Sequence, residues 1–185
     1  MNYLEELTNT GVKRPEGMAA GISSMILQIR KERIKQSLID MDTVGHRQDH
    51  VATIDGVMYY DDSRAESVNA TWFTMENLVR PVVWIAGGNN QGDFDELKSA
   101  ARKNVRAMVC IGNESEKLME TFNKSVADIY QAEDIEEATK IASLVAQEDD
   151  VVLFSPACPS NEETFEARGN RFINAVKQLE NEHNQ

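Results

Sequence analysis

The sequence is poor in the residues that mark disulfide-rich and metal-binding proteins. It contains two cysteines and three histidines among 185 residues. The histidines, His46, His50 and His183, are not clustered, so no metal centre built by this chain is predicted. Cys110 and Cys158 are too few for a disulfide framework and lie in apolar, strand-like segments. We therefore predict two reduced, buried thiols.

Long apolar runs and an excess of positive charge are also missing. Nowhere do about 18 apolar residues follow one another, and "MNYLEELTNTGVKRPEG" lacks the apolar core of a signal peptide. These absences predict a cytoplasmic protein. The 19 basic and 31 acidic residues give a net charge of -12, which argues against nucleic acid or a membrane as partner. Residues 128–150 contain eight acidic residues and one basic residue, Lys140, which indicates a solvated acidic helix face.

Apolar runs alternate with amphipathic stretches in the second half of the chain. The runs are "PVVWIAGG", "VRAMVCIG", "ADIYQA" and "VVLFSPA". The amphipathic stretches cover residues 94–103, 114–122 and 134–147, with a last helix expected over 163–180. Continuous apolar runs are typical of strands covered on both faces and joined in right-handed βαβ units. The predicted fold class is α/β, a Rossmann-like, mostly parallel sheet with flanking helices.

Two further elements are expected before this sheet. In residues 17–41 apolar side chains recur every three or four positions, which predicts a helix pair broken near residues 30–32. The segment "HVATIDGVMYYDD" has two strand-like runs around Asp55-Gly56, a dipeptide favoured in hairpin turns. The only plausible boundary lies near Gly45. We therefore expect a helical appendage over residues 1–44 and an α/β domain over 45–185.

In such a sheet, ligands bind where the strands end, so the loops at Asp61, Gly87 and Ser155 are candidate site segments. In the first loop, "DDSRAESVNATW", Ser63 and Glu66 have the spacing of a capping box. The helix that follows would bury Val68, Trp72, Met75 and Val79. The crowded polar residues are equally what a reactive site at this junction would show.

The other two loops leave similar alternatives open. "AGGNNQGD" lies between a strand and a helix, which suits either a tight turn or an anion site built from backbone N–H groups. It is neither a G-x-G-x-x-G sequence nor a P-loop. In "SPACPSNEETFEARG", Ser160 before Asn161 has the character of a helix cap.

Taken in order, these segments resemble the Mur ligases, the ATP-dependent amide-forming enzymes of peptidoglycan precursor synthesis. The resemblance is strongest to the carboxy-terminal domain of the D-glutamate-adding member. The matching segments are "HRQDHVATIDGVMYYDDSRAESVNATW", "VVWIAGG", "VVLFSPAC" and "FEARG". "GMAAGISSMILQIRKERIKQSLIDM" is similar to the final helices of the family's central domain, so residues 1–44 are interpreted as a remnant of that domain.

The resemblance implies a chemistry of which this sequence carries only a part. The family activates a muramoyl carboxylate as an acyl phosphate, using ATP and magnesium held mainly by the central domain. The chain has no G-x-x-x-x-G-K-[ST] sequence. We therefore expect that it requires no cofactor by itself. ATP and magnesium would act only if a separate ATP-binding chain supplied the central domain.

On the nucleotide side, the resemblance implies that Asp62 holds the ATP ribose and that His46 and Arg47 form the turn beside the nucleotide. Arg64 stands where the family motif has a lysine. The charge is kept, but a planar guanidinium does not replace a compact ammonium at a phosphate. Asp62, His46, Arg47 and Arg64 are thus the implied cofactor-binding residues.

The substrate pocket that the resemblance implies is altered. Its positions are Glu66, Ser67, Asn90, Gln91, Ser160 and Phe165. Glu66 replaces a threonine, Ser67 an asparagine and Gln91 a lysine, whereas Ser160 and Phe165 match. A carboxylate about 4 Å from a substrate carboxylate costs roughly 4 kcal/mol at an effective dielectric near 20, which is about a thousandfold in affinity. We therefore assign no catalytic residue. Arg64 and Gln91 are interpreted as degenerate catalytic positions, and Glu66 is expected to cap a helix.

The leading hypothesis is a stand-alone, non-catalytic binding or regulatory module, a pseudoenzyme of peptidoglycan precursor metabolism. Its partner would be a nucleotide, a cell-wall precursor or a Mur enzyme. The alternative is one part of a split or altered-specificity ligase, in which Arg64 and Glu66 select a cationic or neutral amine. A homo-oligomer formed through an apolar face of residues 18–41 is also left open.

Overall fold

The computed structural model describes residues 45–88 and 93–183, together with Met25, Gln28, Ile29 and Glu32. The chain divides into two compact units, Met1–Met41 and Asp42–Gln185. The four described residues of the first unit are helical. The predicted helix pair and its apolar face otherwise lie outside the described residues, and their origin in a central domain stays a prediction.

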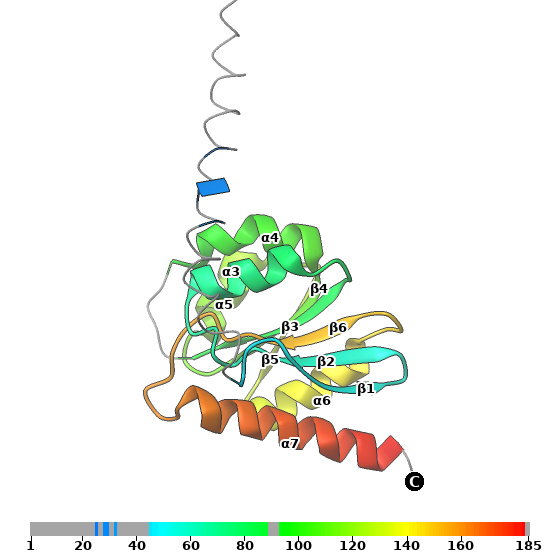
Figure 1. Cartoon of the computed structure of the whole chain (residues 1–185). Helices are drawn as coiled ribbons and strands as arrows, with labels where there is room; N and C mark the ends of the chain where they lie inside the picture. Colours follow the sequence, from blue (N-terminus) through cyan, green and yellow to red (C-terminus); the bar gives the residue numbers. More distant parts are fainter. Residues whose placement is uncertain (1–24, 26–27, 30–31, 33–44, 89–92, 184–185) are drawn as a thin grey trace, which may run out of the picture. The chain divides into compact units, whose positions relative to one another are not determined.

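The described part of the second unit contains a six-stranded sheet, and the predicted α/β fold class is confirmed (Figure 1). The strands are β1 (Asp49–Ile54), β2 (Val57–Asp61), β3 (Val82–Gly87), β4 (Val105–Ile111), β5 (Asp128–Ala132) and β6 (Val151–Phe154). The helices are α3 (Val68–Asn77), the 3₁₀ helix η1 (Phe94–Leu97), α4 (Lys98–Asn104), α5 (Ser115–Phe122), α6 (Ile135–Val145) and α7 (Phe165–His183). The strand order is β1-β2-β6-β3-β4-β5, and only β1 and β2 pair antiparallel.

The predicted hairpin is present and belongs to the sheet itself. Asp55 and Gly56 at its turn have φ values of 49° and 76°. Both lie in the left-handed region that a two-residue hairpin turn of this kind requires. Because β2 also pairs in parallel with β6, the hairpin forms one edge of the six-stranded sheet.

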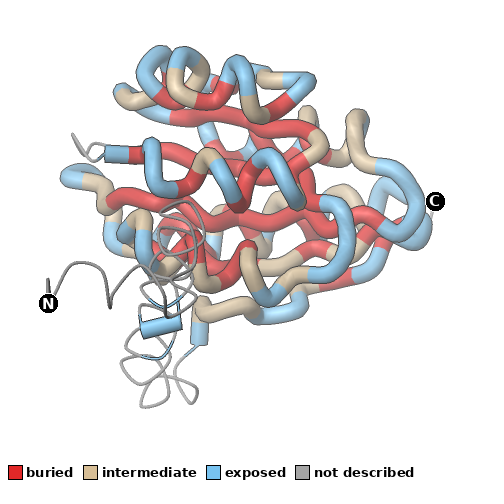
Figure 2. The backbone as a smooth tube through the Cα atoms, turned by 90° about the horizontal axis from the view of Figure 1, so that it is seen from above, coloured by how far each residue is buried: buried red, intermediate tan, exposed pale blue. Residues whose placement is uncertain are grey.

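The central strands of the sheet are buried on both faces, as the continuous apolar runs predict. The edge strand β5 is largely exposed, so this expectation is wrong for "ADIYQA". Every residue of β3 and β6 is buried. Val83 and Ile85 belong to the core cluster that includes side chains of α6 and α7, whereas Trp84 contacts Phe122 of α5 edge to face, with ring centroids 5.3 Å apart. Helices α3, α4 and α5 cover one face of the sheet and α6 and α7 the other (Figures 1 and 2).

The predicted capping box at Ser63 and Glu66 is wrong. Helix α3 begins at Val68, and its N-cap is Ser67, whose hydroxyl accepts a hydrogen bond of 3.3 Å from the backbone N–H of Ala70. Trp72 and Met75 are buried as predicted, but Val79 lies beyond the end of the helix and is 97% exposed. The segment before Ser67 is therefore a loop, and the side chains of Asp61 and Glu66 bond to His46 and Arg168.

Ser160 likewise caps a turn and not a helix. Its hydroxyl accepts hydrogen bonds from the backbone N–H groups of Glu162 and Glu163, at 3.1 and 3.3 Å. Helix α7 begins at Phe165, and the hydroxyl of Thr164 accepts the N–H of Ala167 at 3.2 Å. The last helix thus exists where predicted, with a different capping residue.

Candidate functional site

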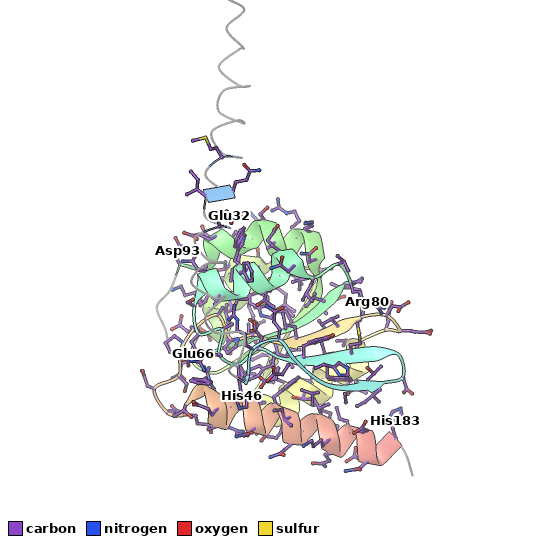
Figure 3. All side chains as sticks on the ribbon, viewed as in Figure 1. Glu32, His46, Glu66, Arg80, Asp93 and His183 are labelled. Carbon is purple, nitrogen blue, oxygen red and sulfur yellow. The ribbon has the colours of Figure 1, made fainter. Side chains whose placement is uncertain are left out.

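The three loops that the sequence singles out lie side by side because β2, β6 and β3 are parallel neighbours. Backbone hydrogen bonds tie them together: the N–H of Asp62 donates to Phe154 O at 2.8 Å, and that of Gly87 donates to Pro156 O at 3.1 Å. Figure 3 shows His46 and Glu66 at this end of the sheet and Arg80 at the opposite end. This is the end at which ligands bind in open α/β sheets.

Asp62 is the centre of a fully buried polar cluster. Its Oδ2 accepts hydrogen bonds from the hydroxyls of Thr74 at 2.7 Å and Ser155 at 2.9 Å. Arg47 Nη1 lies 3.5 Å from Asp62 Oδ1, and the hydroxyls of Thr71 and Ser155 are 2.8 Å apart. Burial raises the pKa of Asp62 to about 6, although Arg47 and the two hydroxyls favour the charged form.

Two atoms of this cluster keep unused hydrogen-bonding capacity. Among the described residues, Asp62 Oδ1 and Arg47 Nη2 are buried and have no hydrogen-bond partner. Buried polar atoms are nearly always satisfied, so these two atoms have capacity for a further polar group.

His46 and Asp61 form a second pair next to this cluster. His46 Nδ1 lies 2.6 Å from Asp61 Oδ2. Burial raises the pKa of Asp61, and hydrogen bonds from His46 and from the backbone N–H of Ser63 oppose that rise. Helix α7 meets the pair at Gly169, where an added Cβ would overlap His46 Nδ1 and lie 2.7 Å from Asp61 Oδ2. A glycine is therefore required for the helix to come this close.

Glu66 forms an ion pair with a buried arginine of α7. Arg168 is 3% exposed, and its Nη2 donates to Glu66 Oε1 at 2.7 Å, whereas the Glu66 side chain is one-third exposed. Arg168 Nη1 makes longer hydrogen bonds, of 3.4 Å each, to Gly87 O and Cys158 O. Glu66 is thus not a helix cap, and that expectation is wrong, whereas its effect on a substrate carboxylate stays a prediction.

Arg64 also has a partner at this end of the sheet. Its guanidinium lies over the Phe165 ring, with Cζ 4.8 Å from the ring centroid. A cavity of about 430 Å³ opens beside Phe165, and its lining includes Glu66, Ser160, Glu162, Glu163 and Glu166. The structure therefore brings together Glu66, Ser160 and Phe165, three of the positions that the resemblance implies.

The other implied pocket positions are not at this cavity or are not described. Ser67 is exposed and caps α3. Asn90 and Gln91 lie outside the described residues, so their place in the pocket stays a prediction. A smaller cavity of about 120 Å³ has Gly87, Gly88, Arg168 and Arg171 in its lining, together with the carboxylates of Glu133, Asp134, Glu162 and Glu163. It shares Ser160, Glu162 and Glu163 with the first.

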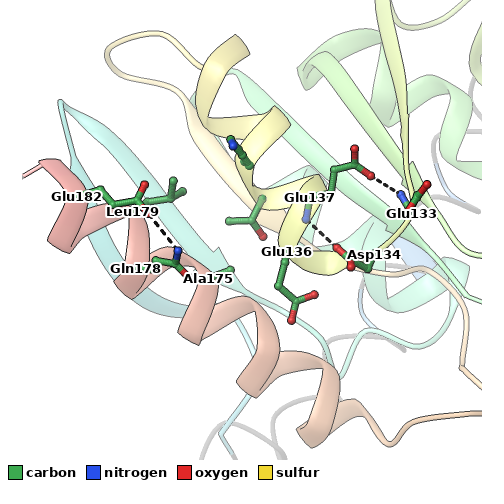
Figure 4. Close-up of a pocket in the computed structure, with 10 residues that line it drawn as sticks. Glu133, Asp134, Glu136, Glu137, Ala175, Gln178, Leu179 and Glu182 are labelled. Carbon is green, nitrogen blue, oxygen red and sulfur yellow. Dashed lines mark hydrogen bonds between the residues drawn. The ribbon is translucent and has the colours of Figure 1, made fainter.

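A larger groove of about 480 Å³ between α6 and α7 is explained by local structure (Figure 4). Asp134 Oδ1 accepts the N–H of Glu137 at 2.8 Å, and Glu137 Oε2 accepts the N–H of Glu133 at 2.7 Å. Glu136 pairs with Arg171, which lowers the pKa of Glu136. These carboxylates cap α6 and join it to α7, so the groove is not a candidate site.

The described part of the chain has two buried cysteines and neither a metal-binding cluster nor a membrane-spanning helix. Cys110 and Cys158 are buried thiols, as predicted, and burial raises the pKa of Cys110 to about 12. Within residues 45–88 and 93–183, no three His, Cys, Asp or Glu side chains are arranged to hold a metal ion. None of the described helices is long and apolar enough to cross a membrane.

Several residues of the site were not assigned a role from the sequence, although Ser155 and Arg168 lie in segments that it singles out. Thr71, Thr74 and Ser155 are hydroxyls that become important only because α3 and the loop after β6 enclose Asp62. Arg168 stands in the "FEARG" segment, but its partner Glu66 is 102 residues away. The spacing of Thr71 and Thr74 on one helix face is the only local signal for any of them.

Comparison with known proteins identifies the family of this domain. Residues 46–158 match the glutamate ligase domain of the Mur ligases. The UDP-N-acetylmuramoylalanine–D-glutamate ligase of Salinibacter ruber is 39% identical over 165 residues, which are 88% of this chain and 36% of that protein. The enzyme of the same name from Christiangramia forsetii is 36% identical, over 88% of this chain and 37% of that protein. The chain thus spans little more than a third of the length of these curated relatives.

Solved structures share the fold at lower identity. A MurF ligase from Thermotoga maritima, in complex with ADP, has a TM-score of 0.53 and 20% identity, covering 74% of this chain and 32% of that one. A murein peptide ligase from Psychrobacter arcticus has a TM-score of 0.52 and 13% identity, over 71% of this chain and 30% of its own. With the domain match over residues 46–158, the chain belongs to the Mur ligase family, as a carboxy-terminal glutamate ligase domain similar to that of the D-glutamate-adding enzymes.

Proposed function

We propose that this chain is a binding or regulatory module of cytoplasmic peptidoglycan precursor metabolism and does not catalyse ligation by itself. The observation that supports this most is the ion pair between Glu66 and Arg168. It lies in the loops where the family resemblance puts the glutamate pocket, and there a carboxylate of the chain itself already bonds the buried cation.

An acidic substrate would meet unfavourable electrostatics in this cavity. Its lining includes the carboxylates of Glu66, Glu162, Glu163 and Glu166. Arg168 would have to give up Glu66, a one-third exposed carboxylate of the same chain that competes with the ligand for the guanidinium. D-glutamate binding would therefore be weaker than in a chain with a neutral residue at position 66.

Arg64, which stands where the family resemblance puts a lysine, contacts a ring of the chain itself. It stacks on Phe165, and a cation–π contact at an exposed site contributes about 0.5–1 kcal/mol. Binding a phosphate would require Arg64 to leave this ring, and its planar fork differs in shape from an ammonium. This supports a loss of phosphate-handling chemistry.

The nucleotide side is better preserved. Asp62 Oδ1 and Arg47 Nη2, which have no hydrogen-bond partner among the described residues, fit a polar group such as a ribose hydroxyl. Asp62 and Arg47, with His46 beside them, would hold the sugar end of a nucleotide. ATP with magnesium would supply phosphoryl-transfer chemistry only together with an ATP-binding domain. We therefore propose at most weak nucleotide binding by these residues.

The test is an assay for ADP formation. The purified chain would be incubated with ATP, magnesium, UDP-N-acetylmuramoyl-alanine and D-glutamate, with the full-length Salinibacter ruber relative as the positive control. We expect no ADP above the level without protein and no heat of D-glutamate binding at millimolar concentration. D-glutamate-dependent ADP release by the chain alone would overturn the proposal.

The preserved cluster around Asp62 also favours a second candidate, one part of a split or altered-specificity amide ligase. In that case the acidic cavity lining would select a cationic or neutral amino acid. The test adds the amino-terminal and central domains of a relative as a separate chain and compares lysine, alanine and glutamate as substrates. ADP formation that needs both chains and prefers lysine would establish this candidate, and no stimulation with any of the three would exclude it.

A further inference from the structure

The edge of the sheet at β5 lacks the features that keep edge strands apart. Among the described residues, β5 pairs with β4 and has no strand on its other side. Such a strand presents a row of unpaired N–H and C=O groups to solvent, which natural proteins commonly protect with a lysine, a proline or a bulge. The sequence of β5, "DIYQA", contains neither lysine nor proline, and its register with β4 is regular.

The opposite edge of the sheet is protected. The register of β1 with β2 shifts between His50 and Ala52, as at a β-bulge, and α7 packs against β1. A bulge bends an edge strand and interrupts its regular pairing. In the described sheet, β5 is therefore the edge that is open to a further strand.

An exposed aromatic ring lies at the middle of this open edge. Tyr130 is the central residue of β5 and is 37% exposed. It pairs with Val109, which belongs to the core cluster that includes side chains of α6, so Tyr130 lies on the face of the sheet that α6 covers. Ile129 lies on the other face and is half-buried. A strand added beside β5 would cover these side chains as well as the backbone groups.

The residues of β5 suit pairing with a second copy of the same strand. One antiparallel register uses all five residues, and it places Tyr130 opposite Tyr130 of the second copy. In this register Asp128 lies opposite Ala132, and Ile129 lies opposite Gln131. No like charges face each other, and the two tyrosines form a cross-strand aromatic pair at the centre.

The charges that flank β5 also favour this arrangement. Lys124 precedes the strand and Glu133 follows it, and both are exposed. Because antiparallel strands run in opposite directions, the end with Lys124 in one copy lies beside the end with Glu133 in the other. Parallel pairing of two copies would bring like ends together.

We propose that β5 is a dimerisation edge, at which the six strands of each of two copies join into one sheet of twelve. The twofold axis passes through Tyr130, and the interface is the same surface on both copies. Strand β5 lies two strands from β3, the nearest strand of the candidate site, so the dimer goes beyond the proposed function and does not depend on it. A pair of short strands is a small interface, so we expect a weak dimer that forms at high protein concentration.

Sedimentation equilibrium of the full chain over a range of concentrations tests the dimer. We expect the average mass to rise from that of one chain, 20.8 kDa, toward twice this value. Tyr130→Lys places two like charges opposite each other at the axis and should weaken the dimer by about tenfold. Val79→Lys is the matched control, because Val79 is 97% exposed and lies in the loop between α3 and β3. A mass of one chain at every concentration, or an equal effect of both substitutions, would overturn the proposal.

Cross-linking tests the register and stays informative if Tyr130→Lys does not fold. In Tyr130→Cys the two new thiols would face each other with Cα atoms about 4.5–5.5 Å apart, within reach of a disulfide. In the control, Asp128→Cys, the two thiols would be offset by four residues, about 13 Å, which is too far. Cys110 and Cys158 are buried and should not react. Mild oxidation should give a covalent dimer of Tyr130→Cys alone, and no dimer or equal amounts with both variants would refute the twofold pairing.

Discussion

The buried carboxyl of Asp62 should make the stability of the domain depend on pH. Burial raises its pKa from 3.8 to about 6 in the folded protein, and in the unfolded chain the pKa returns to near the lower value. The folded state therefore holds the proton more tightly. Asp62 contributes stability that is fully present below about pH 4 and is lost as the pH rises through about 6. A difference of roughly two pH units corresponds to about 3 kcal/mol, at 1.36 kcal/mol per unit.

The variant Asp62→Asn isolates this contribution. Asparagine does not titrate, and its side-chain oxygen can still accept the hydroxyls of Thr74 and Ser155. The free energy of unfolding of the variant minus that of the unchanged chain should rise by about 3 kcal/mol between about pH 4 and pH 8. Urea denaturation at a series of pH values measures this difference.

The control is Asp149→Asn, which removes an exposed ion pair with Arg80. It should change the free energy of unfolding by less than about 1 kcal/mol at each pH. A difference for Asp62→Asn that stays constant, or that falls as the pH rises, would refute the reasoning. It would mean that pairing with Arg47, and not burial, dominates the pKa of Asp62.

Three further outcomes test the packing. Gly169→Ala should lower the free energy of unfolding by at least about 1–3 kcal/mol, because its Cβ would overlap the His46 ring. Thermal unfolding measures this change, with Gly45→Ala as the control, since the nearest contact of its Cβ would lie at 3.7 Å. Ser67→Ala should cost about 1 kcal/mol in chemical denaturation by removing the N-cap of α3, and an unchanged stability would contradict that cap. Cys110 and Cys158 should not react with a thiol reagent in the native protein and should both react in denaturant, so rapid native labelling would argue against their burial.

The sequence predicts the strands and helices of this domain well because burial on both faces leaves a direct pattern. The run around Trp84 is apolar at every position, and every residue of β3 is buried. The turn at Asp55 and Gly56 is predictable for the same local reason, since few residues accept its backbone angles. Such features depend on neighbours in the sequence.

The helix starts are less predictable because distant groups compete for the same polar side chains. Ser63 and Glu66 have the spacing of a capping box, but Asp61 Oδ1 accepts the Ser63 N–H at 3.0 Å, and Arg168 binds Glu66 from 102 residues away. Ser67 becomes the cap instead. A local pattern cannot show which of two partners is nearer in the folded chain.

The same difference between local and distant contacts decides how much of the candidate site is predictable. The family resemblance locates Asp62 and Glu66, but neither the two hydroxyls on Asp62 nor the cation on Glu66 can be read from it. From the sequence alone, Glu66 is a negative charge without a partner, whereas in the structure it is paired with Arg168 of α7. A prediction from charge alone therefore misses a buried partner that comes from a distant element.

The strand order has a consequence for how the chain is made. Strand β6 lies between β2 and β3, although it is the last strand of the described sheet to be synthesised. Until it leaves the ribosome, the hairpin and β3 each expose an edge of unpaired backbone groups, which favours association with other chains. Pairing across such sequence distances is also slow. Because Ser155 directly follows β6, the hydroxyl that completes the Asp62 cluster arrives in this same late step.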